Sequence, residues 1–134
     1  MAQVKLVQDS EASPEVRAVF DDIRKTRNTD YVNNIWRALA AQPPVLKRFW
    51  GQMKEIMATP SRIDPLTKEY IYLAVSITNN CDYCINSHTA AARKQGMDDA
   101  TLAELVEIVA LANAGNRLTQ GLQVEVDERY KPKA

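Results

Sequence analysis

The chain has 134 residues, of which 46% are hydrophobic and 25% are charged, and its 17 basic residues balance 17 acidic ones. This balance excludes a global electrostatic attraction to nucleic acid or to an anionic membrane surface. A chain of this length buries about two-thirds of the surface that its unfolded form exposes, so it can build a core without disulfide bonds. We therefore expect one globular domain.

The first residues lack the apolar core of a signal peptide. The longest strongly apolar stretch, near Ile71 to Ile77, is far too short to span a bilayer. Both features favour a cytoplasmic protein without a membrane partner, and the charge balance favours no nucleic-acid partner. In a reducing compartment, a lone C-x-x-C motif serves redox or metal chemistry more often than it forms a structural bridge.

Apolar residues in the first half of the chain recur at helical spacing, and no stretch alternates as a strand would. Ser13-Pro14 predicts the start of a helix that should end near Asn28. A short helix is expected over 33–41, and Pro43-Pro44 should end it and open the next one. Residues 59–61 should form a loop.

The second half of the chain follows the same pattern. Asp64-Pro65 predicts a helix to about Thr78 that is apolar almost all round and therefore central. After a break at Asn79-Asn80, a helix that carries Cys81 should end at Gly96.

Two more helices are expected after Gly96. Asp98 should cap the first of them. Gly115-Asn116 allows a kink or turn, and a last helix is expected to carry Leu118, Leu122 and Val126. The sequence thus predicts an all-α single domain over 1–134, a bundle of six to seven helices. An N-terminal arm at 1–12 and a frayed tail at 130–134 should flank it.

The only two cysteines and the one histidine of the chain lie close together, at Cys81, Cys84 and His88. Separations of three and four residues place all three on one face of a helix. The first helical turn favours the thiolate, which is the nucleophilic form of cysteine. His88 is placed to relay a proton to or from Cys84, and two cysteines three residues apart can close a disulfide after one is oxidised.

A carboxylate on the preceding helix is the fourth candidate. Glu69 lies twelve residues before Cys81, in an apolar segment that includes Leu66 and Leu73. Burying a carboxylate there is costly unless it has a partner, and a partnered carboxylate is a candidate proton carrier. A glutamate near a helix start is also typical of a solvated residue, which periodicity alone favours, so both interpretations stay open.

The set of Glu69, Cys81-x-x-Cys84 and His88 resembles the signature of the alkylhydroperoxidase D (AhpD)-like branch of the carboxymuconolactone decarboxylase family. Flanking stretches at 33–40, 73–76 and 87–92 support the resemblance, which covers most of the chain. It implies an AhpD-like helical bundle with the C-x-x-C pair at the N-terminus of a central helix. It also implies a homo-oligomer, commonly a trimer or hexamer.

The resemblance further implies an antioxidant peroxidase that needs no cofactor and no metal. Carried onto the matching positions, it makes Cys84 the attacker of a hydroperoxide and Cys81 the resolving thiol, with Glu69 and His88 as proton relay. The helix dipole alone would instead favour Cys81 as the attacker. The resulting disulfide would be reduced by a dithiol partner, a lipoylated or thioredoxin-like protein.

One residue departs from the family pattern. The best-known AhpD-type sites carry a histidine between the two cysteines, and this chain carries Tyr83 there. A phenol cannot replace an imidazole as a base near neutrality. Tyr83 is therefore at most an auxiliary hydrogen-bond donor, and its presence puts efficient peroxidase turnover in doubt.

Three other interpretations stay open. The redox pair could serve a disulfide oxidoreductase or a redox sensor without peroxide turnover. Cys81, Cys84, His88 and Glu69 could bind Zn²⁺, although three ligands on one helix face rarely surround a metal. Taken singly, a buried cysteine and a hydrogen-bonded histidine are also common in an inert helical oligomerisation domain.

Overall fold

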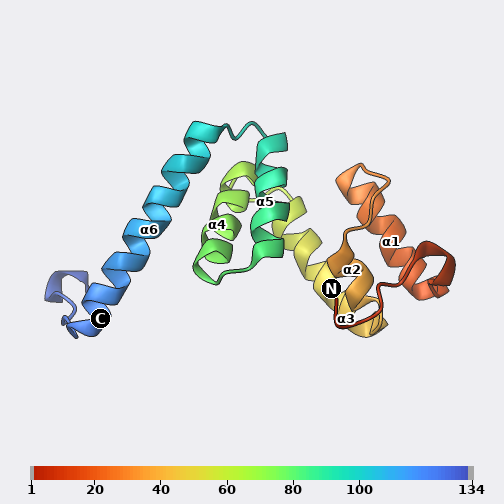
Figure 1. Cartoon of the computed structure of the whole chain (residues 1–134), viewed down its shortest axis with the longest axis horizontal. Coiled ribbons are helices and arrows are strands. Elements are labelled where there is room, and N and C mark those ends of the chain that lie inside the picture. Colours follow the sequence, from red (N-terminus) through yellow and green to blue (C-terminus); the bar gives the residue numbers. More distant parts are fainter. Residues whose placement is uncertain (1, 133–134) are drawn as a thin grey trace. The chain divides into compact units, whose positions relative to one another are not determined.

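The computed structural model of the chain describes residues 2–132. These residues contain six α-helices and shorter helical turns, which confirms the predicted all-α class (Figure 1). The chain divides into two compact units, Met1–Arg62 and Ile63–Ala134. Each unit has its own cluster of buried apolar side chains. The expectation of a single domain over 1–134 stays a prediction.

The first unit is built from short, capped helices. Its elements are η1 (Asp9–Glu11), α1 (Pro14–Arg27), α2 (Asn34–Leu39), α3 (Pro43–Met53) and the π-helical turn η2 (Lys54–Ala58). The predicted start of α1 is confirmed, because Ser13 Oγ accepts a hydrogen bond from the Val16 amide at 3.3 Å. The core of this unit consists of Ala12, Val16, Phe20, Ile23, Val32, Trp36, Ala40, Leu46 and Trp50.

The Asp22 carboxylate links α1 by hydrogen bonds to the end of α3 and the first residue of η2. Asp22 Oδ2 accepts a hydrogen bond from the Trp50 indole N–H at 2.7 Å, and the Lys54 ammonium donates to both Asp22 oxygens at 2.8 and 3.0 Å. The Lys54 hydrogen bond, followed by that of Trp50, holds the pKa of Asp22 below its ordinary value. The stability that this carboxylate contributes is therefore present above the ordinary carboxyl pKa and lost as the pH falls through the folded value.

The second unit carries the C-x-x-C pair. Its elements are α4 (Pro65–Thr78), α5 (Asp82–Lys94), α6 (Asp99–Gly121) and η3 (Glu128–Tyr130). Helices α4 and α5 pack against each other, and α6 also packs against α4 (Figure 1). Leu73 of α4, Ala92 of α5 and Met97 form the buried centre of this unit.

The predicted caps of the second unit are confirmed. Asp64 Oδ1 accepts the Thr67 amide at 3.0 Å, and Asp98 Oδ1 accepts the Thr101 amide at 2.8 Å. Gly96 follows the end of α5 with a φ of 104°, a left-handed conformation that glycine adopts without a Cβ clash. Each cap satisfies backbone groups that a helix terminus leaves unpaired.

The separate last helix expected after Gly115-Asn116 is wrong. Helix α6 runs unbroken through both residues to Gly121, and Val126 lies beyond it. One glycine lowers helix stability by about 1 kcal/mol relative to alanine, which is too little to end a helix whose other residues favour it. The Thr119 hydroxyl also donates to the Gly115 and Asn116 carbonyls, at 3.0 and 3.2 Å.

The ends of the chain bear on two further expectations. The expected arm at 1–12 contains the helical turn η1, and Tyr130, the first residue of the expected frayed tail, ends η3. Residues 1, 133 and 134 of these segments lie outside the described residues. Within residues 2–132, no helix is both long and apolar enough to cross a membrane.

We expect Asp22→Ala to lower the free energy of unfolding by about 1–3 kcal/mol, because it leaves the indole N–H of a buried tryptophan without its acceptor. Trp50 is 4% exposed. Urea denaturation followed by circular dichroism measures the change. Asp21→Ala is the matched control: its carboxylate is 65% exposed and pairs with Arg24, so it should lose less than about 1 kcal/mol. Equal losses in the two variants would contradict the assignment.

Candidate active site

The two cysteines are bonded to each other at the start of α5. Cys81 and Cys84 form a disulfide whose Cα atoms lie 5.3 Å apart. Cys81 is the N-cap of the helix, and its Sγ accepts a hydrogen bond from the Cys84 amide at 3.3 Å. Both residues are partly buried. The C-x-x-C pair therefore occupies the N-terminus of its helix, as predicted.

Helices α4 and α5 bring Glu69 and His88 together. His88 Nδ1 lies 2.6 Å from Glu69 Oε2, and the side chains are 16% and 14% exposed, respectively. Each polar group thereby gives the other the partner that partial burial requires. Glu69 is thus paired and largely buried, and the solvated interpretation of this carboxylate is wrong.

The sequence did not single out an aromatic residue that also contacts the histidine. The Tyr72 ring stacks on the His88 imidazole, with ring centroids 3.7 Å apart and planes at 20°. Tyr72 follows Glu69 by three residues on α4, which places both on one face of that helix. This spacing is the signal that could have identified Tyr72, but an aromatic at helical spacing is more typical of a core residue.

Tyr83, the residue that departs from the family pattern, lies in the first turn of α5 and is 44% exposed. Its role as an auxiliary hydrogen-bond donor stays a prediction. Within the described part of the chain, no group of three or more His, Cys, Asp or Glu side chains is arranged to hold a metal ion. The two sulfur atoms that a zinc site would use are bonded to each other in the disulfide.

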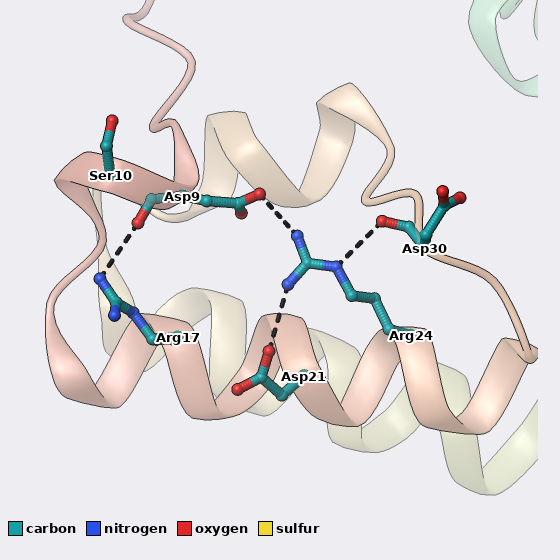
Figure 2. A pocket seen from close by; sticks show the side chains of 6 residues that line it. All are labelled: Asp9, Ser10, Arg17, Asp21, Arg24 and Asp30. Carbon is teal, nitrogen blue, oxygen red and sulfur yellow. Dashed lines mark hydrogen bonds and ion pairs between the residues drawn. The ribbon is translucent and has the colours of Figure 1, made fainter.

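The first unit has an open pocket, whose lining residues lie between positions 9 and 30 (Figure 2). Arg24 donates hydrogen bonds to the carboxylates of Asp9 and Asp21 and to the Asp30 carbonyl, and Arg17 donates to the Asp9 carbonyl. The Arg24 hydrogen bond holds the pKa of Asp9 below its ordinary value. These charged groups are satisfied by one another, so we assign no ligand to this pocket.

Comparison with known proteins assigns the chain to a family. The model of the carboxymuconolactone decarboxylase family matches residues 43–125. The chain is also similar to the crystal structure of the alkylhydroperoxidase AhpD core from Rhodospirillum rubrum ATCC 11170, with 52% identity, 99% of each chain covered and a TM-score of 0.96. The chain therefore belongs to the carboxymuconolactone decarboxylase family, in its AhpD-like branch.

Two curated relatives are longer proteins. The alkyl hydroperoxide reductase AhpD of Maricaulis maris (strain MCS10) is 41% identical over 59 residues, which are 44% of this chain and 34% of that protein. The (R)-2-haloacid dehalogenase of Pseudomonas putida is 23% identical over 110 residues, which are 79% of this chain and 35% of that protein. The chain thus spans about a third of the length of each.

We expect the protein purified without reductant to show no reactive thiol, and to show two after reduction, because the Cα separation of 5.3 Å lets the disulfide close without moving the backbone. Thiol titration under denaturing conditions measures both numbers. Far-UV circular dichroism should be the same in the two states. Loss of helix on reduction, or two reactive thiols in the unreduced protein, would contradict this expectation.

Proposed function

We propose that this protein is a thiol-dependent hydroperoxidase that cycles Cys81 and Cys84 between dithiol and disulfide. One observation carries the proposal: α5, the helix that carries the disulfide at its N-terminus, packs against α4, and the two helices together hold a largely buried glutamate–histidine pair, Glu69 and His88. Redox-active thiols need a group that moves protons, and a histidine oriented by a carboxylate is suited to that task. The similarity to the AhpD core supports the same activity.

The oxidative half of the cycle starts from the dithiol. With Glu69 ionised, His88 donates its Nδ1–H to the carboxylate, and Nε2 is left with a lone pair that accepts the thiol proton of Cys84. The Cys84 thiolate attacks the terminal oxygen of the hydroperoxide, and the O–O bond breaks. The alkoxide takes a proton from His88 and leaves as the alcohol, while Cys84 becomes a sulfenic acid.

The second half of the cycle restores the thiols. The Cys81 thiol gives up its proton and attacks the sulfur of the Cys84 sulfenic acid. Hydroxide leaves, takes up that proton to become water, and the disulfide forms. An external dithiol then reduces this disulfide by thiol–disulfide exchange. It gives up two electrons and two protons, so one hydroperoxide and one dithiol yield one alcohol, one water and one oxidised partner. We propose a lipoylated or thioredoxin-like protein as the dithiol.

The assignment of Cys84 as the attacker rests on two arguments. The family resemblance assigns this role to the second cysteine, and the spacing of four residues in α5 puts Cys84 one turn before His88. The helix N-terminus instead favours a thiolate at Cys81, which caps α5. Experiment can separate the two assignments, because a sulfenic acid forms only on the attacking sulfur.

We expect Cys84→Ser to lose peroxide consumption by at least about 10³-fold, since removing a covalent nucleophile typically costs that much or more. Cys81→Ser is the matched variant: it should still react once with tert-butyl hydroperoxide and give a sulfenic acid that dimedone traps at Cys84. Consumption is followed with dihydrolipoamide as reductant, and the adduct by mass spectrometry. Full peroxide consumption by Cys84→Ser would contradict the assignment. So would a dimedone adduct on Cys81 in the Cys84→Ser protein.

A disulfide oxidoreductase or redox sensor is the second candidate, and Tyr83 is the observation that favours it. A phenol that is 44% exposed stands between the cysteines where the best-known AhpD-type sites carry a histidine, which removes one base from the site. Such a protein would exchange disulfides with a dithiol at a rate that hydroperoxide does not change. Peroxide consumption measured with several dithiols distinguishes the two candidates.

We further propose that the protein assembles as a homo-oligomer through α6. Val109 is the only buried residue of this helix, all of which is described. Large apolar side chains of the helix are exposed, among them Leu111 at 75% and Leu118 at 63%. Leu111 and Leu118 are seven residues apart and therefore share one face of the helix. An exposed apolar face marks an interaction site, and a second copy of a chain without net charge meets no global repulsion. The resemblance implies a trimer or hexamer.

We expect Leu111→Glu to shift the protein toward the protomer mass in light scattering coupled to gel filtration, because a buried unpaired carboxylate disfavours an apolar interface. Gln120→Glu, which adds the same charge at an exposed polar position of α6, is the control and should leave the mass unchanged. Far-UV circular dichroism checks that both variants are folded. A wild-type protein that runs at the protomer mass would contradict the proposal.

A further inference from the structure

Two neighbouring side chains of α4 hold the His88 ring in different ways. Glu69 engages the edge of the ring through Nδ1 at 2.6 Å, whereas Tyr72 covers one face of it at 3.7 Å between centroids. A centroid separation of 3.7 Å with planes at 20° is van der Waals contact over the whole ring. The imidazole is therefore constrained at its edge and over a face.

The hydrogen bond by itself does not fix the orientation of the ring. The χ2 torsion of histidine is broad, so a ring bonded through one nitrogen can still rock about that bond. Rocking would move Nε2, the atom that faces away from Glu69 and that the proposed cycle uses as the base. The Tyr72 ring blocks this motion on one side because no atom can move into the space it occupies.

The same segment of α4 is also hydrogen-bonded to the backbone of Cys81. The hydroxyl of Ser76, which is 3% exposed, donates to the Tyr72 carbonyl at 2.7 Å. The Ser76 carbonyl in turn accepts the Cys81 amide at 3.0 Å. The backbone that carries the Tyr72 ring and the backbone at the first cysteine are thus connected through one buried residue.

We propose that Tyr72 is a positioning residue, whose ring holds the His88 imidazole so that Nε2 can exchange a proton with Cys84. This inference rests on the proposed function of His88 and adds the residue that orients it. The contact on which it depends is made by the ring, so phenylalanine should serve at this position as well as tyrosine. An aliphatic side chain should not, because it lacks a flat face.

The test measures the single-turnover rate at which reduced protein loses its free thiols after mixing with tert-butyl hydroperoxide. We expect Tyr72→Leu to slow this rate by about tenfold, since a misplacement of ~1 Å at a reacting group can cost up to ~10²-fold. Tyr72→Phe should stay within about twofold of wild type. Tyr70→Leu, the same change at a partly buried tyrosine of α4, is the matched control and should also stay within about twofold.

A double-variant cycle separates positioning from a structural effect. His88→Gln should slow the reaction by about 100-fold, and adding Tyr72→Leu to it should slow it no further, since the ring to be positioned is gone. A further tenfold loss in the double variant would overturn the inference, as would an unchanged rate in Tyr72→Leu or an equal loss in Tyr72→Phe. An unchanged rate in His88→Gln would overturn the proposed relay, and the inference with it.

A spectroscopic measurement tests the contact without any reaction. The chain has one histidine, so its imidazole C–H signals are unambiguous in an NMR spectrum. The Tyr72 ring should shift them upfield in wild type and Tyr72→Phe, and this shift should be lost in Tyr72→Leu. Imidazole signals at random-coil positions in the wild-type protein would overturn the inference even if Tyr72→Leu failed to fold.

Discussion

The tight turn between α4 and α5 is the constraint on which the candidate site depends. The Cys81 amide donates to the Ser76 carbonyl, and Asn80 takes the left-handed conformation, with a φ of 55°, that lets the chain reverse within three residues. Helix α5 therefore returns along α4. This return brings a glutamate of the first helix against the histidine of the second and leaves the disulfide at the turn itself.

Partial burial explains why the glutamate and the histidine are useful only as a pair. Each side chain is mostly removed from solvent, so either one alone would lose much of its hydration without gaining this hydrogen bond in return. Together they satisfy each other, and the carboxylate also selects which imidazole nitrogen carries the hydrogen. The stacked ring of Tyr72 adds a steric limit that a hydrogen bond does not supply. Orientation of the imidazole thus depends on packing as well as on the hydrogen bond to the carboxylate.

The parts of the structure that the sequence predicted well are those set by neighbouring residues. The caps at Ser13, Asp64 and Asp98 were predictable because a cap joins a side chain to an amide three residues on. The continuity of α6 through Gly115 was not predictable, because the point at which a helix ends depends on the helix propensities of many residues together. Nor could periodicity decide whether Glu69 is solvated, because its partner lies 19 residues away on another helix.

All of the proposed reacting groups, together with Tyr72, lie between residues 69 and 88. The entropy needed to close a loop grows only with the logarithm of its length, and contacts between near neighbours in the sequence form fastest. A helical hairpin with so short a turn can therefore assemble this chemistry early in folding and at small entropic cost. The first unit contributes none of these groups, so a substitution there leaves every proposed reacting side chain in place.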